Sequence, residues 1–186
     1  MKKVLLLIIS ILLISTATYA YETVLINFPP RDKWIAVLHE TQGGESILQY
    51  VPQGQSSQNW TRTLIFHSYK KNGGFNYNDA TDLINTTTAQ MEYQNGSSRY
   101  KFIKYNGSDS IATRCVKGNS RVPTQCEILR TSTSYEGLIS MHYINKNVSD
   151  FKSAYDLWYQ IIQDIRIYYS YYMDDRILDK ATSFEL

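Results

Sequence analysis

Short segments in which apolar and polar residues alternate make up much of this chain, and turn-forming residues separate them. Alternation with a period of two places the two sets of side chains on opposite faces of a β-strand. Several turns between the segments contain glycine, which favours antiparallel neighbours joined by hairpins. The segments predicted as strands are 23–28, 34–41, 46–51, 59–69, 99–105, 110–117, 125–132 and 136–144.

Two further segments have helical periodicity. The first is predicted to run from Asn78 or Asp79 to about Gln94. The second is predicted to run from Phe151, capped by Asp150, to about residue 172, because its apolar residues recur at i, i+3/4 and i+7. The two apolar stripes consist of Leu83, Ile84, Thr87 and Met91, and of Phe151, Ala154, Tyr155, Trp158, Ile162, Ile165, Tyr169 and Tyr172.

Together these patterns predict a single α+β domain over residues 21–172, followed by a C-terminal tail, 173–186. We expect an antiparallel β-sheet of about six to seven strands flanked by one mid-chain helix and a long C-terminal helix. That arrangement buries both the apolar strand faces and the helix stripes. Trp60 is expected to be a core residue that begins a central strand, and not a platform on which a ligand stacks.

Residues 1–20 have the layout of a secretory signal peptide. Two lysines precede an apolar stretch from Val4 to Ile14, and the segment closes with Thr-Tyr-Ala. The stretch is shorter than the roughly 20 residues that a membrane-spanning helix requires. We therefore expect cleavage after Ala20 and a periplasmic or secreted protein without an integral membrane segment.

The charge balance argues against a nucleic-acid-binding protein. The formal net charge is +2, and both excess charges lie in the leader. Without the leader, 17 of the 19 Lys and Arg residues remain, against 17 Asp and Glu. Nucleic-acid-binding domains carry a clear cationic excess, so we expect no nucleic-acid partner.

The only two cysteines, Cys115 and Cys126, are predicted to form a structural disulfide. An exported protein meets an oxidising compartment, and the turn-rich segment between the two residues fits the end of a β-hairpin. A metal site is the alternative, but two cysteines with no adjacent His or Cys do not fill a tetrahedral shell. A thioredoxin-type redox pair requires closer spacing.

Two segments carry a resemblance to known proteins. One is VPQGQSSQNWTRTLIF, residues 51–66, a polar loop followed by Asn59-Trp60-Thr61 at the start of a strand; the other is strand 137–144 leading into the final helix. The pattern resembles small uncharacterised exported proteins of Gram-negative bacteria and, more distantly, PsbP-like domains. The resemblance covers the order of elements over most of the chain. It implies an accessory or binding module with an antiparallel sheet between helices, and no catalytic residue to carry over.

The sequence contains no recognisable catalytic motif. The three histidines, His39, His67 and His142, fall in separate predicted strands and lack the helical spacing of zinc proteases. The segment 54–58, GQSSQ, lacks the second glycine of a nucleophile elbow, and no glycine-rich phosphate loop occurs. We expect neither a metal nor a cofactor.

Paired carboxylates are the chemistry that is hardest to exclude. Glu40 and Glu45 flank a predicted hairpin, and Asp174-Asp175 follows the last predicted helix. A glycosidase requires two carboxyl groups that face each other across a cleft, and sequence alone does not place these groups there.

The C-terminal helix supplies the candidate partner surface. If residues 151–172 form one helix, Ile167 points away from Trp158, and Tyr171 lies one turn beyond Ile167. The predicted surface consists of Tyr159, Ile167, Tyr168 and Tyr171. It would contact an unknown protein partner or a second copy of the chain; the alternative is that the tail folds back over it.

These observations favour an exported accessory or binding protein of PsbP-like type that is not an enzyme. Two alternatives remain open: a secreted hydrolase acting on envelope or host polymers, and a secreted factor acting on a host cell.

Overall fold

A computed structural model of the protein describes residues 21–70, 79–95, 98–104, 106–120, 123–135, 137–170 and 182–185. The expected signal peptide and its cleavage position therefore lie outside the described residues, as does Tyr171. None of the helices in the described ranges is long and apolar enough to cross a membrane.

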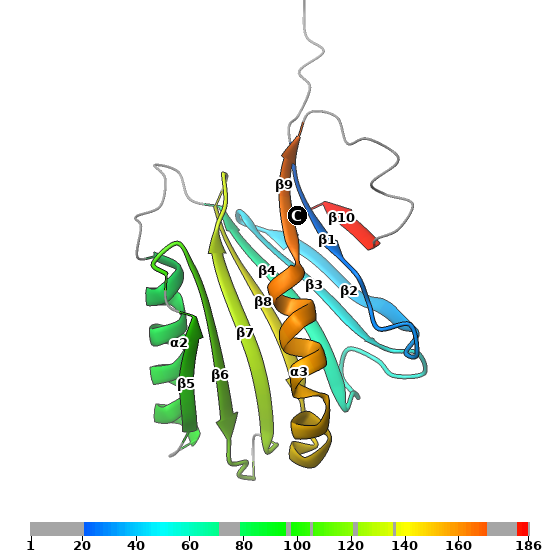
Figure 1. Cartoon of the computed structure of the whole chain (residues 1–186), viewed down its shortest axis with the longest axis vertical. Helices are drawn as coiled ribbons and strands as arrows, with labels where there is room; N and C mark the ends of the chain where they lie inside the picture. The colour runs from blue at the N-terminus through cyan, green and yellow to red at the C-terminus, as the bar shows by residue number, and fades with distance from the viewer. Residues whose placement is uncertain are drawn as a thin grey trace, which may run out of the picture.

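The strands and helices follow one another in the order that the sequence predicts as far as residue 164 (Figure 1). The elements are β1 (Tyr21–Ile26), β2 (Trp34–Gln42), β3 (Glu45–Pro52), β4 (Arg62–Lys70), α2 (Asp79–Asn95), β5 (Ser98–Lys104), β6 (Asp109–Val116), β7 (Gln125–Thr133), β8 (Gly137–Asn145), α3 (Val148–Asp164), β9 (Arg166–Ser170) and β10 (Thr182–Glu185).

Seven of the strands form one antiparallel sheet in the order β2-β3-β4-β8-β7-β6-β5. The predicted α+β class and antiparallel sheet are confirmed, as is the placement of one helix in mid-chain and one near the C-terminus. Strand β1 is not part of this sheet. It pairs with β9 and β10 in a separate three-stranded sheet.

The predicted extent of the C-terminal helix is wrong. Helix α3 begins after the N-cap Asn147, whose side chain accepts hydrogen bonds from the backbone N–H groups of Ser149 and Asp150. It ends at Asp164, with Ile165 as its C-cap, because residues 166–170, Arg-Ile-Tyr-Tyr-Ser, form β9 and pair with β1. The β-branched and aromatic residues of this segment favour a strand. Its partner, β1, lies far away in the sequence.

A partly buried arginine closes the C-terminal end of α3. Arg130 of β7 donates from Nη1 to the carbonyl oxygens of Ile162, Gln163 and Ile165, at 3.2, 3.1 and 2.8 Å. The last carbonyl groups of a helix lack partners within the helix, so a cation at this point both satisfies them and complements the helix dipole.

Helix α3 and the three-stranded sheet cover one face of the seven-stranded sheet (Figure 1). Trp158 of α3 is 1% exposed, and its ring stacks on Tyr143 of β8 with centroids 4.0 Å apart. Val24 and Ile26 of β1 belong to the same core cluster. Burial raises the pKa of Tyr143 to about 12.

Trp60 is not part of this core, contrary to the sequence prediction. It precedes β4 and is only half-buried, and the ammonium group of Lys146 lies 3.6 Å from the centroid of its ring. The first residue of the strand is Arg62, so the loop extends three residues further than the predicted strand 59–69 suggests.

Helix α2 covers part of the opposite face, over β5, β6 and β7. Ile84 packs there with Ala112 and Leu129 in a small second cluster. The helix buries Ala80, Thr81, Ile84 and Thr88 most deeply, so only Ile84 of its predicted stripe is fully buried. The hydroxyl groups of Thr81 and Ser110 are 2.7 Å apart, which satisfies two buried polar groups.

Candidate binding face

The strands β2, β3, β4 and β8 continue the α2-covered face of the sheet beyond the helix. Because side chains alternate along each strand and residues in register share a face, the pairing defines which residues lie there. We call the following set the β2–β8 half-face: Ile35, Leu38, Glu40, Gln42, Glu45, Ile47, Gln49, Val51, Thr63, Ile65, His67, Tyr69, Leu138, Ser140, His142 and Ile144.

A first polar chain starts at the exposed end of this half-face. Glu45 Oε2 lies 3.1 Å from His67 Nε2, and the Tyr69 hydroxyl lies 2.6 Å from His67 Nδ1. Desolvation by burial lowers the pKa of His67 despite the hydrogen bond to Glu45, so the ring is neutral at pH 7. A neutral ring can donate from Nε2 to the carboxylate and accept the tyrosine proton at Nδ1.

A second polar chain runs from the half-face towards α2. His142 Nε2 lies 2.9 Å from Ser140 Oγ, and its Nδ1 lies 3.3 Å from Glu127 Oε2. Burial and the charge of Arg114 lower the pKa of His142 to about 3. This ring is therefore also neutral, donating to Glu127 and accepting from the serine hydroxyl.

Arg114 of β6 ends the second chain beneath α2. Its Nε pairs with Glu127 Oε1, and its Nη1 donates to the hydroxyl oxygens of Thr87 and Thr88, each at 3.0 Å. Arg114 and Glu127 are 3% and 2% exposed, and burial lowers the pKa of the arginine to about 10. The polar chain thus ties the half-face to the helix that borders it.

The order Ser140, His142, Glu127 matches the connectivity of a serine-hydrolase triad but lacks its other requirements. β8 is a central strand paired on both sides with β4 and β7, so its ladder amide groups serve the sheet and do not converge on an oxyanion. Ser140 is 1% exposed, which closes its hydroxyl to a polymer substrate. The geometry supports a buried structural network and not acyl transfer.

The accessible chemistry of the half-face is acidic. A shallow depression of about 270 Å³ is lined by Glu40, Gln42, Glu45 and Ile47, all of which belong to the half-face. The positions of the half-face include no lysine or arginine. The exposed side chains of this face thus include glutamates and partly exposed isoleucines, of which Ile35 is 38% exposed.

The structure brings together several residues that the sequence identified only separately. Glu40, Glu45, His67 and His142 share the half-face, whereas His39 lies on the other side of β2. Sequence reasoning missed Tyr69, Ser140, Glu127 and Arg114. The only available signal was the i, i+2 spacing that places His67 with Tyr69, and Ser140 with His142, on the same face of a strand.

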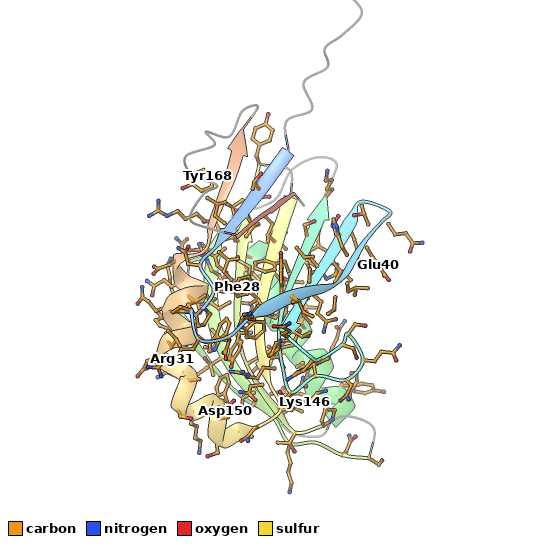
Figure 2. The ribbon with its side chains drawn as sticks, turned by 90° about the vertical axis from the view of Figure 1, so that its right-hand side faces the viewer. Phe28, Arg31, Glu40, Lys146, Asp150 and Tyr168 are labelled. Carbon is orange, nitrogen blue, oxygen red and sulfur yellow. A yellow bond between two sulfur atoms is a disulfide. The ribbon has the colours of Figure 1, made fainter. Side chains whose placement is uncertain are left out.

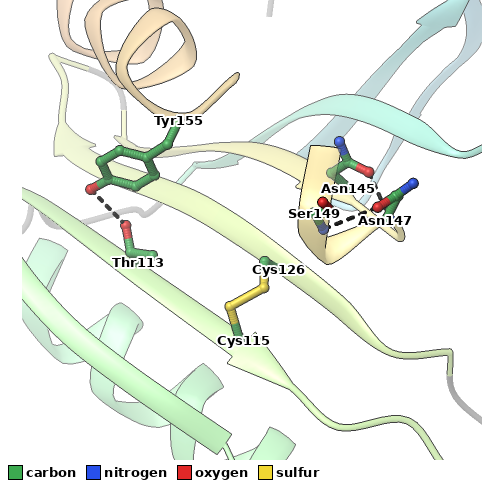
Figure 3. Close-up of a disulfide and its surroundings, with 7 residues drawn as sticks. All are labelled: Thr113, Cys115, Cys126, Asn145, Asn147, Ser149 and Tyr155. Carbon is green, nitrogen blue, oxygen red and sulfur yellow. Dashed lines mark hydrogen bonds between the residues drawn. A yellow bond between two sulfur atoms is a disulfide. The ribbon is translucent and has the colours of Figure 1, made fainter. Parts of the chain in front are cut away.

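The cysteine pair lies on the opposite face of the sheet. Cys115 of β6 and Cys126 of β7 are directly opposite each other in the ladder and form a disulfide (Figure 3). This is the hairpin cross-link that the sequence predicts. Within the described ranges, no group of three or more His, Cys, Asp or Glu residues is arranged to hold a metal ion.

The predicted partner surface does not form a helical face. Tyr159 lies on α3 and packs against the core, with its ring stacked on Tyr155. Ile167 and Tyr168 lie on β9, where Ile167 is opposite Val24, so no helical turn relates Ile167 to residue 171. Ile167 and Tyr168 instead line part of a depression of about 490 Å³ at the junction of α3 and β9.

Comparison with known proteins does not add a function. No family model, no curated protein and no solved structure matches this chain.

Proposed function

We propose that this protein is an exported binding module, not an enzyme, that holds a basic and partly apolar segment of a protein partner on the β2–β8 half-face. The observation that carries the proposal is the combination of exposed Glu40 and Glu45 with apolar side chains on a face without lysine or arginine. The PsbP-like resemblance also implies an accessory or binding role.

The chemistry of the face selects the class of partner. Two accessible carboxylates attract a cationic ligand and repel an acidic one. The neighbouring Ile35, Ile47 and Ile65 are all at least partly exposed, so the aliphatic stems of the partner's lysine side chains can cover them while the ammonium groups reach the carboxylates. In an extended segment in which basic and apolar residues alternate, all the basic side chains point to the same face.

Fluorescence anisotropy of labelled octapeptides tests this proposal. We expect an alternating lysine–valine octapeptide to bind the purified protein, and an alternating glutamate–valine octapeptide of the same length not to bind. The double substitution Glu40→Gln and Glu45→Gln removes two partly exposed ion pairs, which together contribute about 1.4 kcal/mol, so Kd should rise about tenfold. The glutamine at position 45 keeps an oxygen acceptor for His67.

A matched control removes the same number of charges elsewhere. Asp82 and Asp156 are exposed on α2 and α3, and Asp82→Asn with Asp156→Asn should leave Kd within about twofold, because screened charges away from the face contribute little. Equal binding of the two peptides, or equal losses in the two double variants, would contradict the proposed function.

A further inference from the structure

The two edges of the seven-stranded sheet differ in how well they are protected. β5 forms one edge, and β2 forms the other. Unpaired backbone N–H and C=O groups of an edge strand can pair with another chain, and proteins usually block them with lysines, prolines, bulges or a covering element.

The β5 edge carries several of these devices. The strand is bulged between Phe102 and Lys104, it contacts α2, and it has exposed lysines at positions 101 and 104. A further strand would have to approach these charges and the adjoining helix.

The β2 edge is much less protected. The strand contains neither lysine nor proline, and β3 is the only strand that pairs with it among the described residues. One bulge lies between Ala36 and Leu38. Beyond that bulge, Leu38–Gln42 remains in continuous register with β3.

The same five residues adjoin the acidic depression. Glu40 and Gln42 line it, and residues 39–42 are all exposed. Figure 2 shows Glu40 on the outer strand at the end near the hairpin, well away from Tyr168. Glu40 is the only Asp, Glu, Lys or Arg residue of Leu38–Gln42, so the edge itself favours a basic partner.

We infer that the basic segment binds as an added β-strand along Leu38–Gln42 of β2. This inference rests on the proposed function and specifies how the segment binds. Five residues of ladder span about 17 Å. Alternate side chains of the added strand then lie over Glu40 and Gln42, where lysine is favoured, while the intervening apolar side chains lie on the face of His39 and Thr41.

Backbone methylation of the peptide distinguishes strand addition from contact through side chains alone. In an added strand, alternate N–H groups point towards the sheet, and the lysine–valine alternation fixes which residues provide them. We therefore compare the lysine–valine octapeptide with two versions, one N-methylated at its lysines and the other at its valines.

Strand addition predicts that one methylated version loses at least about tenfold in affinity while the other stays within about twofold of the parent peptide. If both versions bind as tightly as the parent, or both lose equally, the inference is overturned, although charge-dependent binding of the parent peptide still supports the proposed function. If the parent peptide itself does not bind, the proposed function fails as well.

Two measurements on the protein complete the test. Hydrogen exchange followed by NMR should show new protection of alternate amides in Leu38–Gln42 when the parent peptide is added; unchanged exchange there would overturn the inference. Light scattering coupled to size exclusion should show a monomer. A dimer in which those same amides are protected without peptide would show that a second copy, not a basic peptide, occupies the edge.

Discussion

Replacing Arg114 with methionine tests whether the buried polar network anchors α2 to the sheet. The substitution roughly preserves the volume of the side chain but removes the charge that faces Glu127. It also removes the two hydrogen bonds of 3.0 Å to Thr87 and Thr88.

The expected cost follows from burial. Glu127 is 2% exposed, so Arg114→Met leaves a carboxylate in the interior with only the neutral His142 as a polar partner. Breaking a buried pair by removing one partner destabilises by about 3–5 kcal/mol, whereas replacing both partners with apolar residues is often nearly neutral. We therefore expect Arg114→Met with Glu127→Leu to remain within about 2 kcal/mol of the parent protein.

Urea unfolding at pH 7 measures both variants, and NMR supplies an independent reading. The charge of Arg114 is one cause of the pKa of about 3 at His142, so the His142 pKa should rise in the single variant. A loss below about 1 kcal/mol for Arg114→Met, or a double variant as unstable as the single one, would refute the reasoning.

Three further predictions concern stability. The Cys115–Cys126 disulfide closes a loop with a sequence separation of 11, so its reduction should lower the free energy of unfolding by about 3 kcal/mol in urea. Thiol titration of the denatured, unreduced protein should find no free thiol. Two reactive thiols per chain would contradict the prediction. Trp158→Ala should lower the free energy of unfolding by about 3–5 kcal/mol because the ring is fully buried. Trp60→Ala should lower it by only about 1 kcal/mol, through the lost contact with Lys146. Equal losses in the two variants would show that the core is wrongly placed. Burial lowers the pKa of His142 in the folded protein to about 3, below its ordinary value of 6.5. The folded state therefore binds fewer protons than the unfolded state, so stability should fall as pH drops below 6.5. An NMR titration in which His142 protonates near pH 6.5 would be inconsistent with this.

Local sequence patterns predicted most of the main sheet because its order is local. β3, β6, β7 and β8 begin and end within about two residues of the predicted strands, since period-two alternation and turn residues determine both their faces and their ends. In this sheet β4 and β8 are the one neighbouring pair of strands that do not follow each other in the sequence; every other strand pairs with the strand next to it along the chain.

The C-terminal region was mispredicted because its structure depends on a distant strand. Ile165, Ile167 and the tyrosines that follow continue an apolar pattern that fits a helix almost as well as a strand. What decides between them is the pairing of β9 with β1, together with the cap that Arg130 places on α3. Neither interaction has a signal in the local sequence.

The half-face could be predicted only in part for a similar reason. Sequence marked Glu40 and Glu45 as neighbours across a hairpin, and the alternation places His67 with Tyr69 on one face of a strand. It could not show that β4 and β8 are adjacent, so it could not bring His67 and His142 onto one surface.

Chemical-shift mapping of the isotopically labelled protein with the lysine–valine octapeptide tests the central claim most directly. The account predicts saturable shifts of amides in β2, β3 and β4, including those of Glu40, Glu45 and His67, and unchanged amides around Tyr159 and Tyr168. Shifts concentrated at α3 and β9, with the amides of the β2–β8 half-face unchanged, would contradict it.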